Sequence, residues 1–313
     1  MTDVSVLVPS YNHSRFVEAT LRSIFAQTLR PKKLIVIDDG SKDESGAEIE
    51  RVLKDCPFEC EFIARENKGL SATLNEGFAL LDGGYFAYLG SDDIWLPTFL
   101  EEQTKLLDSR PDAALAFCHA FVVDDEDNII DRTDNWTAFA DGDLLPTLLR
   151  GEIFSSPGVV YRRSILPERP WNEDSRLEDY ELYLNLACGS EFARNADVLC
   201  AWRQHSSNTS DNFPLMLCEQ IAAQDRAIDK LKVSRAELDR IQRELRFRSV
   251  ANCVRSGHKA EGWKLFRENF AGAASSIDVV REAVRLAVPQ YLFNRNRMRK
   301  RHNSISKYGK LKL

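Results

Sequence analysis

The chain of 313 residues contains no apolar run of the roughly 18–20 residues that a membrane-spanning helix requires. Its first residues show neither the basic nor the apolar region of a signal peptide, so we expect no export signal. The seven cysteines are scattered, and the closest two, Cys56 and Cys60, have no histidine beside them. We therefore expect reduced thiols rather than a zinc site or a disulfide framework, which favours a cytoplasmic protein.

Charge is unevenly distributed along the chain. The net charge is −6, yet eight basic residues and no acid lie between Asn294 and the end. An acidic body with a basic tail argues against a general nucleic-acid-binding protein. A basic tail of this kind suits an anionic lipid surface or an acidic partner, so peripheral contact with the inner membrane face is one expectation.

Strands and helices alternate over the first ninety residues. The predicted strands are Val4–Pro9, Lys33–Ser41, Cys60–Arg65 and Tyr85–Gly90, and the predicted helices are Arg15–Gln27, Asp43–Leu53 and Leu70–Leu81. Apolar strands without alternation, separated by helices, predict a mostly parallel sheet covered on both faces. The polar segments PSYN, DDGS, ENKG and GSDD each follow a strand. They should gather along one edge of the sheet, where such sheets bind ligands.

The remainder of the chain is less regular and becomes helical towards its end. We predict strands at Ala113–Val123, Asn128–Asp131 and Val198–His205, and helices at Arg176–Gly189, Leu215–Lys232, Arg235–Ser256, His258–Phe270 and Val279–Tyr291. The last helix carries an apolar stripe, which suits either a membrane-surface anchor or, as we favour, packing on the body or in a homo-oligomer. The acidic run DDEDN (124–128) lacks the glycine and the distal glutamate of a calcium loop and predicts a hairpin turn.

Two adjacent acids, Asp92 and Asp93, lie in the segment GSDD. Like charges this close repel one another unless a cation is bound, and a hard divalent ion such as Mn²⁺ or Mg²⁺ takes oxygen ligands. Such an ion would also neutralise a leaving diphosphate. Adjacent aspartates before a helix are also a common capping arrangement, so the pair alone leaves both interpretations open.

Other side chains on the same edge suit a nucleotide. Tyr11 offers a ring that can stack on a base, and Asp39 can accept hydrogen bonds from a base or a ribose hydroxyl. Gly40 and Gly69 allow a tight turn or the close approach of a ligand. The run Asp-Asp-Gly-Ser is equally a good turn and helix-cap sequence, so this segment alone does not decide between the two interpretations.

Five segments in order resemble the family-2 inverting glycosyltransferases with the GT-A fold. They are VSVLVPSYNHSRFVEATLRSIFAQTLRPKKLIVIDDGSKD, ENKGLSATLNEGF, YLGSDDIWLP, LEDYELYLNLA and WRQHSSNTS, and they cover roughly residues 3–210. The resemblance implies a Rossmann-like, mostly parallel mixed sheet flanked by helices. We divide the chain into a GT-A domain at 1–211, a helical extension at 212–293 and a basic tail at 294–313.

The resemblance also implies roles for residues of the nucleotide and metal sites. Pro9, Tyr11 and Asp39 match the part of the family that holds the nucleoside, most often uridine. Asp93 would be the direct metal ligand, and Asp92 would contact the ribose or support the metal, which we expect to be Mn²⁺ or Mg²⁺.

For the chemical step, the resemblance implies that Asp179 is the catalytic base, with Glu178 beside it. His205 matches a histidine often found near the metal and the diphosphate. Inversion needs one displacement at the anomeric carbon, which a carboxylate base and a cation can support without a covalent intermediate. The alternative role for Glu178 and Asp179 is charge compensation at a helix N-terminus.

Two positions depart from the usual family pattern. Gly90 stands where an aspartate is common, and Leu74 stands where an arginine is common. A cation near the diphosphate is therefore missing from its usual place, and Lys68, Arg15 or Arg203 are candidates to supply it.

The predicted function is metal-dependent, inverting transfer of a sugar from a nucleotide-sugar donor, most often UDP-linked, to a hydroxyl of a glycan or lipid-linked glycan. The family implies a setting in bacterial surface polysaccharide synthesis. A non-catalytic subunit that binds a nucleotide sugar or a glycan is the alternative, and the two departures favour it. A nucleotidyltransferase should carry a glycine-rich basic loop after the first strand, and PSYNHSR is not such a loop.

Overall fold

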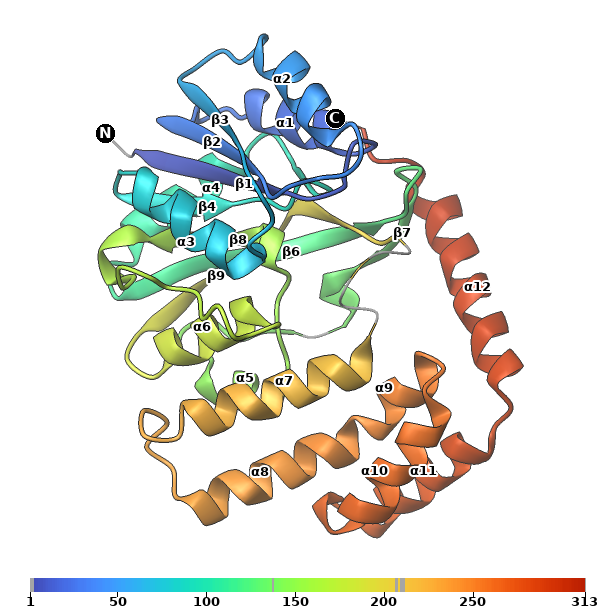
Figure 1. Ribbon diagram of the computed structural model, residues 1–313. Coiled ribbons are helices and arrows are strands. Elements are labelled where there is room, and N and C mark those ends of the chain that lie inside the picture. Colours follow the sequence, from blue (N-terminus) through green and yellow to red (C-terminus); the bar gives the residue numbers. More distant parts are fainter. Residues whose placement is uncertain (1–2, 137, 206–207, 209–211, 313) are drawn as a thin grey trace.

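The computed structural model describes residues 3–136, 138–205, 208 and 212–312 (Figure 1). The described strands are β1 (Val4–Ser10), β2 (Lys33–Asp38), β3 (Cys60–Ala64), β4 (Tyr85–Tyr88), β5 (Ile94–Trp95), β6 (Ala113–Val123), β7 (Ile129–Arg132), β8 (Val159–Arg162) and β9 (Glu191–Arg203). They form one mixed sheet in the order β3-β2-β1-β4-β8-β6-β9-β5, and β7 pairs with β6. β1 to β4 are mutually parallel and β6 is parallel to β9, whereas β8, β5 and β7 run antiparallel to their neighbours.

Helices cover both faces of this sheet. They are α1 (Val17–Phe25), α2 (Ser45–Leu53), α3 (Leu70–Leu80), α4 (Phe99–Ser109), α5 (Leu145–Leu149) and α6 (Glu178–Ala187). Side chains of β1 alternate between the faces, so Val6 and Val8 pack with α1, α2 and α4 while Leu7 packs with α3 and α6. The predicted α/β fold, a mixed sheet flanked by helices, is confirmed, with parallel pairing throughout β1 to β4 and antiparallel pairing at β5, β7 and β8.

The helical extension follows β9 (Figure 1). Its helices are α7 (Phe213–Arg226), α8 (Arg235–Arg248), α9 (Val250–Arg255), α10 (Lys259–Asn269), α11 (Ser276–Ala287) and α12 (Gln290–Tyr308). Side chains of α7 to α11 form a separate apolar core that includes Leu217, Val254 and Leu286. Among the described helices, none is both long enough and apolar enough to cross a bilayer.

Several predicted boundaries were wrong for identifiable reasons. The predicted helix Val279–Tyr291 is broken, because Pro289 cannot continue a helix and leaves Val288 extended. The helix predicted at Arg235–Ser256 is interrupted at Ser249. β9 begins at Glu191, before the predicted start at Val198, because the polar residues Arg194, Asn195 and Asp197 interrupt the apolar pattern of its first half. The two short strands β5 and β8 were not predicted.

The apolar stripe expected on the helix Val279–Tyr291 is only partly covered. On α11 the inward side chains include Leu286, which is buried, whereas Val280 and Val284 are 62% and 60% exposed. Most of the basic tail predicted at 294–313 lies in α12, which spans the predicted boundary between extension and tail.

Candidate functional site

The four polar turns predicted to meet do lie together at the carboxyl ends of the parallel strands. In the turn after β1, the backbone amide of Asn12 donates to Ser41 Oγ in the turn after β2, over 2.8 Å. From the same turn, Nδ1 of His13 lies 2.8 Å from the hydroxyl of Ser91 in the turn after β4. Asn12 adopts a positive φ of 56°, a conformation that asparagine tolerates better than most residues. The sheet edge therefore brings the polar turns into direct contact.

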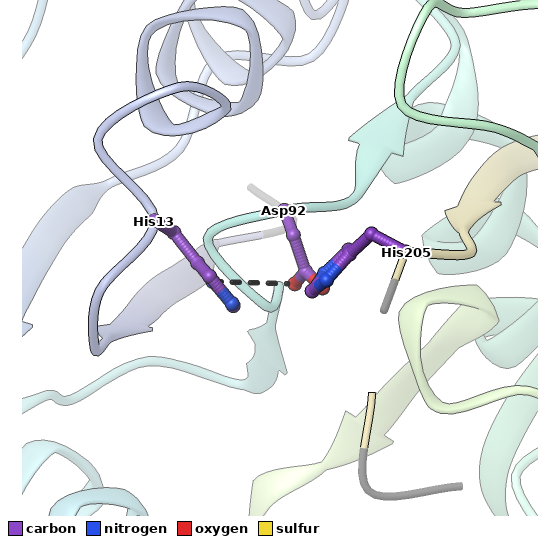
Figure 2. Close-up of side chains that lie close together, drawn as sticks. All are labelled: His13, Asp92 and His205. Carbon is purple, nitrogen blue, oxygen red and sulfur yellow. Dashed lines mark hydrogen bonds and ion pairs between the residues drawn. The ribbon is translucent and has the colours of Figure 1, made fainter. Parts of the chain in front are cut away.

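Three side chains on this edge converge to form a candidate metal centre, which we call the His–Asp–His cluster: His13, Asp92 and His205 (Figure 2). Nε2 of His205 lies 2.9 Å from Asp92 Oδ2, and Nδ1 of His13 lies 3.7 Å from Asp92 Oδ1. One ligand atom from each residue lies within 4.8 Å of the others. The residues come from the turns after β1, β4 and β9. β1 and β4 are neighbours in the sheet, and β5, which begins just after Asp92, pairs with β9 at Ala201, so these pairings bring the three turns together.

His13 was not singled out from the sequence. A signal was present, because His13 lies two residues after Tyr11 in a turn already expected to meet GSDD. What the sequence did not show was that this ring, rather than the second aspartate, faces Asp92.

An aromatic ring and a guanidinium group pack against the His–Asp–His cluster. The ring of Phe16 stacks on that of His205 at a centroid distance of 5.1 Å, and the guanidinium of Arg203 lies 4.8 Å from the Phe16 centroid. Arg203 is 2% exposed, and its Nε donates to the carbonyl of Asp92 over 2.8 Å. Its Nη2 pairs with Asp127 on the β6–β7 hairpin at 2.7 Å. The guanidinium of Arg203 is therefore used to hold the loop that carries Asp92. It is buried and already paired, so it is not available to bind a diphosphate.

Burial and mutual charge shape the titration of the cluster. Burial lowers the pKa of His13, and the charge of His205 acts in the same direction while Asp92 opposes it. Burial alone would raise the pKa of Asp92, but its hydrogen bond with His205 and the charges of both imidazoles keep that pKa below its usual value. The cluster therefore favours a neutral imidazole at His13 beside an ionised carboxylate at Asp92, which is the form in which these two side chains bind a metal.

Asp93, predicted as the direct metal ligand, lies outside the cluster. Its Oδ1 accepts the backbone amide of Arg203 over 2.8 Å, and its carbonyl accepts the hydroxyl of Thr20 over 2.8 Å. Burial and the neighbouring charge of Asp92 raise its pKa well above the usual value. Asp93 therefore ties the loop to β9 and α1, whereas Asp92 presents its carboxylate to the two histidines.

Gly90, one of the two departures from the family pattern, lies next to the carboxylates of Asp92 and Asp93. A Cβ at this position would lie 2.9 Å from Asp92 Oδ1 and 3.3 Å from Asp93 Oδ2. The carboxylate of Asp92 therefore occupies space that a side chain at position 90 would need.

The residues predicted to bind the nucleoside include an exposed aromatic ring and a carboxylate that already accepts several hydrogen bonds. Tyr11 is 45% exposed, whereas Pro9 is buried within β1. Asp39 is 4% exposed and accepts the backbone amides of Lys68 and Gly69, each over 2.8 Å, and it pairs with Arg65. Asp39 thus organises the loop before α3 and retains limited acceptor capacity for a ligand. The side chain of Lys68 is exposed and pairs with Glu76 at 3.2 Å.

Leu74, the second departure, does not face the site. Its side chain is fully buried among the apolar residues between α3 and the sheet. A cation at this position would enter the core, so the residue here is explained by packing rather than by a missing contact.

Glu178 and Asp179 begin α6 and lie half-buried at its N-terminus. Burial, followed by the charge of Asp179, raises the pKa of Glu178 to about 8, and burial raises the pKa of Asp179 to about 6. The charges of both acids also act on the buried phenol of Tyr88, the last residue of β4. The loop that carries Asp92 follows β4 immediately, so the acid pair lies at the same edge of the sheet as the cluster.

Comparisons with known proteins bear on the family and the fold of the chain. The family model described as Glycosyl transferase family 2 matches residues 5–169, which is more than half of the chain. An uncharacterized glycosyltransferase of Nostoc sp. is 29% identical over 167 residues, which are 52% of this chain and 52% of that protein. The chain thus spans about half the length of this relative.

Solved structures share the fold at low sequence identity. The mannosyltransferase PcManGT from Pyrobaculum calidifontis, in complex with GDP-Man and Mn²⁺, matches with a TM-score of 0.62 and 17% identity over 97% of this chain and 86% of that one. Residues 1–349 of S. aureus TarS, in complex with UDP-GlcNAc, match with a TM-score of 0.58 and 15% identity over 98% and 91%. At these identities the likeness concerns the fold alone.

Proposed function

The chain belongs to glycosyltransferase family 2, and from that premise we propose that it transfers a sugar from a nucleotide-sugar donor to an acceptor hydroxyl with inversion at the anomeric carbon. The observation that carries the proposal is the position of the His–Asp–His cluster at the same sheet edge as Tyr11, Asp39 and the acid pair of α6. Each part of a displacement reaction has a candidate group there.

The His–Asp–His cluster fits a divalent metal ion in the chemistry of its donors. Two imidazole nitrogens and one carboxylate, within 4.8 Å of one another, can all turn towards a single ion. Mg²⁺ prefers an all-oxygen shell, whereas Mn²⁺ accepts imidazole as well, so we propose Mn²⁺ as the resident ion. When bound, the ion supplies a Lewis acid that neutralises a departing diphosphate. The metal role shifts from Asp93 to Asp92, with His13 and His205 as the other ligands.

The acid pair of α6 supplies the proton acceptor. Because the pair titrates with pKa values of about 6 and about 8, at neutral pH Asp179 is ionised while Glu178 holds its proton. Asp179 then takes the proton of the acceptor hydroxyl as that oxygen attacks the anomeric carbon. The bond between the sugar and the diphosphate oxygen breaks in the same displacement, and the electron pair leaves with the diphosphate.

The donor is proposed to be UDP-linked and the acceptor a glycan or lipid-linked glycan in surface polysaccharide synthesis. The two solved neighbours were determined with GDP-Man and UDP-GlcNAc, so a GDP-linked sugar is the main alternative to a UDP-linked donor. Tyr11 provides the exposed ring on which either base would stack.

Thermal unfolding with a panel of UDP- and GDP-sugars, with and without Mn²⁺, tests the binding half of the proposal. A ligand that binds only the folded state raises the midpoint of unfolding, so the true donor should stabilise the protein more strongly with Mn²⁺ present. Asp92→Asn should remove most of the Mn²⁺-dependent shift, whereas Asp93→Asn should lower the baseline midpoint and retain the shift. Equal loss in both variants, or transfer that proceeds unchanged in EDTA, would contradict the assigned metal site.

A non-catalytic subunit that binds a nucleotide sugar remains the second candidate, favoured by the two departures from the family pattern. The structure removes one of them, because Leu74 is a core residue. Asp179→Asn separates the two functions: it should abolish transfer while leaving the donor-dependent thermal shift nearly intact. A protein that binds donor but transfers or hydrolyses none of it would support the binding subunit.

A further inference from the structure

Helix α12 runs along the outside of the molecule, from the helical extension to the β6–β7 hairpin (Figure 1). It has 19 residues, none of which is buried, and residues 294–303 are all exposed. Most helices in a folded protein are held by an apolar face that packs against a core. α12 lacks such a face along most of its length, so its surroundings must stabilise it in another way.

The charge of α12 points to an anionic neighbour. Four of its basic residues, Arg295, Arg297, Arg299 and Lys300, form no ion pair within the part of the chain that the structure describes. The helix contains no acid. Arg295 and Arg299 lie four residues apart, as do Arg297 and Arg301, and like charges at this spacing repel one another on a helix. An anionic surface would remove that repulsion.

The outward stripe of α12 also carries apolar groups. Tyr291, Arg295, Met298, Arg299 and His302 recur at helical spacing and share one face, and all are exposed. Tyr291 is 65% exposed and Met298 is 64% exposed. An aromatic ring and a thioether set among guanidinium groups suit the headgroup layer of a bilayer, which offers apolar chains next to negative charge. A nucleic acid would satisfy the charge but gives no reason to expose Met298.

The far end of α12 is fixed to the hairpin beside the candidate site. Arg301 pairs with Asp124 at 2.6 Å, and beyond the helix the amide of Leu311 donates to the carbonyl of Asp127 over 2.8 Å. Tyr308 and Leu311 pack against the apolar residues under that hairpin. The basic stripe is therefore held in place relative to the hairpin that also anchors Arg203, rather than lying on a loose tail.

We propose that the exposed face of α12 docks onto a bilayer surface that contains anionic phospholipids. Arg295 and Arg299 on this face meet the headgroups, Arg297 and Lys300 on the other exposed sides add to the attraction at longer range, and Tyr291 and Met298 enter the interfacial layer. This proposal concerns the surface of the protein alone and does not depend on the donor, the acceptor or the metal.

Sedimentation with lipid vesicles tests it on the full chain. Vesicles of phosphatidylcholine alone are compared with vesicles that also contain phosphatidylglycerol, at low and high salt. The variant Arg295→Gln/Arg297→Gln/Arg299→Gln/Lys300→Gln removes the unpaired charge of α12, both on the outward stripe (Arg295 and Arg299) and on the other sides of the helix (Arg297 and Lys300), and leaves Arg301 on Asp124. A matched control, Arg30→Gln/Lys54→Gln/Arg243→Gln/Arg267→Gln, removes the same charge from exposed positions elsewhere. Unchanged circular dichroism and melting temperature show that each variant is folded.

We expect the wild type to bind only the anionic vesicles and to dissociate as salt rises, because surface charge attraction is screened. The α12 variant should bind at least about tenfold more weakly, and the matched control should bind like the wild type. Met298→Gln, made in the wild-type chain, should also weaken binding to the anionic vesicles, although it leaves the charge of α12 unchanged. Absence of binding to anionic vesicles at low salt, or equal loss in both charge variants, would overturn the proposal. Binding of a single-stranded RNA in place of vesicles, sensitive to the α12 variant, would overturn it in favour of a nucleic-acid partner.

Discussion

Replacing Asp179 by asparagine should make the protein inactive and, near neutral pH, more stable. Asp179 is held at a pKa of about 6 against a usual value of 3.8, a difference of 2.2 units. At ~1.36 kcal/mol per unit, keeping it ionised costs the folded state up to ~3 kcal/mol. The half-buried side chain is partly screened by solvent, and its charge at the N-terminus of α6 returns ~0.3–1 kcal/mol. We therefore expect Asp179→Asn to raise the free energy of unfolding by about 1–2 kcal/mol.

The dependence of this gain on pH identifies its cause. A carboxyl whose pKa is raised by folding binds its proton more tightly in the folded state, so its contribution is favourable below the unfolded pKa and is lost as pH rises through the folded pKa. The difference between variant and wild type should be largest above pH ~6 and should shrink towards zero near pH ~4. Removing the charge of Asp179 also lets the pKa of Glu178 fall towards its usual value, which adds to the gain.

Urea unfolding at about pH 7.5, 6 and 4.5 measures the effect. Asp229→Asn serves as the control, because Asp229 is exposed on the helical extension and its side chain forms no ion pair within the described residues, so its effect should be small at every pH. A variant at position 179 that is less stable than the wild type at pH 7.5 would refute the reasoning. So would a gain that stays constant down to pH 4.5, since that would show a packing effect rather than a charge effect.

Three other substitutions follow from the geometry. Gly90→Ala places a Cβ 2.9 Å from Asp92 Oδ1, so it should weaken Mn²⁺ affinity in a metal titration at least about tenfold while the melting temperature changes little; unchanged Mn²⁺ affinity would show that the loop relaxes freely. Leu74→Arg, which restores the residue common in the family, should destabilise by more than ~3 kcal/mol in urea unfolding, and a gain in activity instead would mean that position 74 reaches the site. Arg203→Met should cost ~3–5 kcal/mol by the same assay, because it leaves Asp127 and the loop carbonyls without their donor, and a neutral result would contradict its anchoring role.

The sequence was sufficient for the sheet edge because strand ends are a local property. Each of the segments PSYN, DDGS, ENKG and GSDD follows an apolar run, and parallel strands must end together, so their meeting needed no knowledge of side-chain directions. The position of His205 near the metal came instead from the resemblance to the family, although His205 follows a strand as well. The break at Pro289 was also readable, because proline ends the helix that the apolar stripe suggested.

The sequence did not predict the direction in which each side chain of a loop or helix points. Asp92 and Asp93 are adjacent and chemically identical, and only the contact between Asp93 and the amide of Arg203, 110 residues away, turns one inward. Leu74 is a second example, in which a residue expected to face the site points away from it. A residue compared with family members by position was taken as a missing contact, although its side chain points into the core.

The course of α12 gives the helical extension a second point of support. On one side the extension is already packed against the sheet domain, because Ala223 and Ala227 of α7 lie in the same apolar core as Tyr180 of α6, and Arg226 pairs with Glu181. The contacts of Arg301 and of the strand-like segment after Tyr308 with the β6–β7 hairpin add another attachment on the far side. The extension is therefore attached to the sheet domain on two sides, through the core shared by α7 and α6 and through the hairpin. Removal of the last residues would release only the hairpin side and leave the packed core in place.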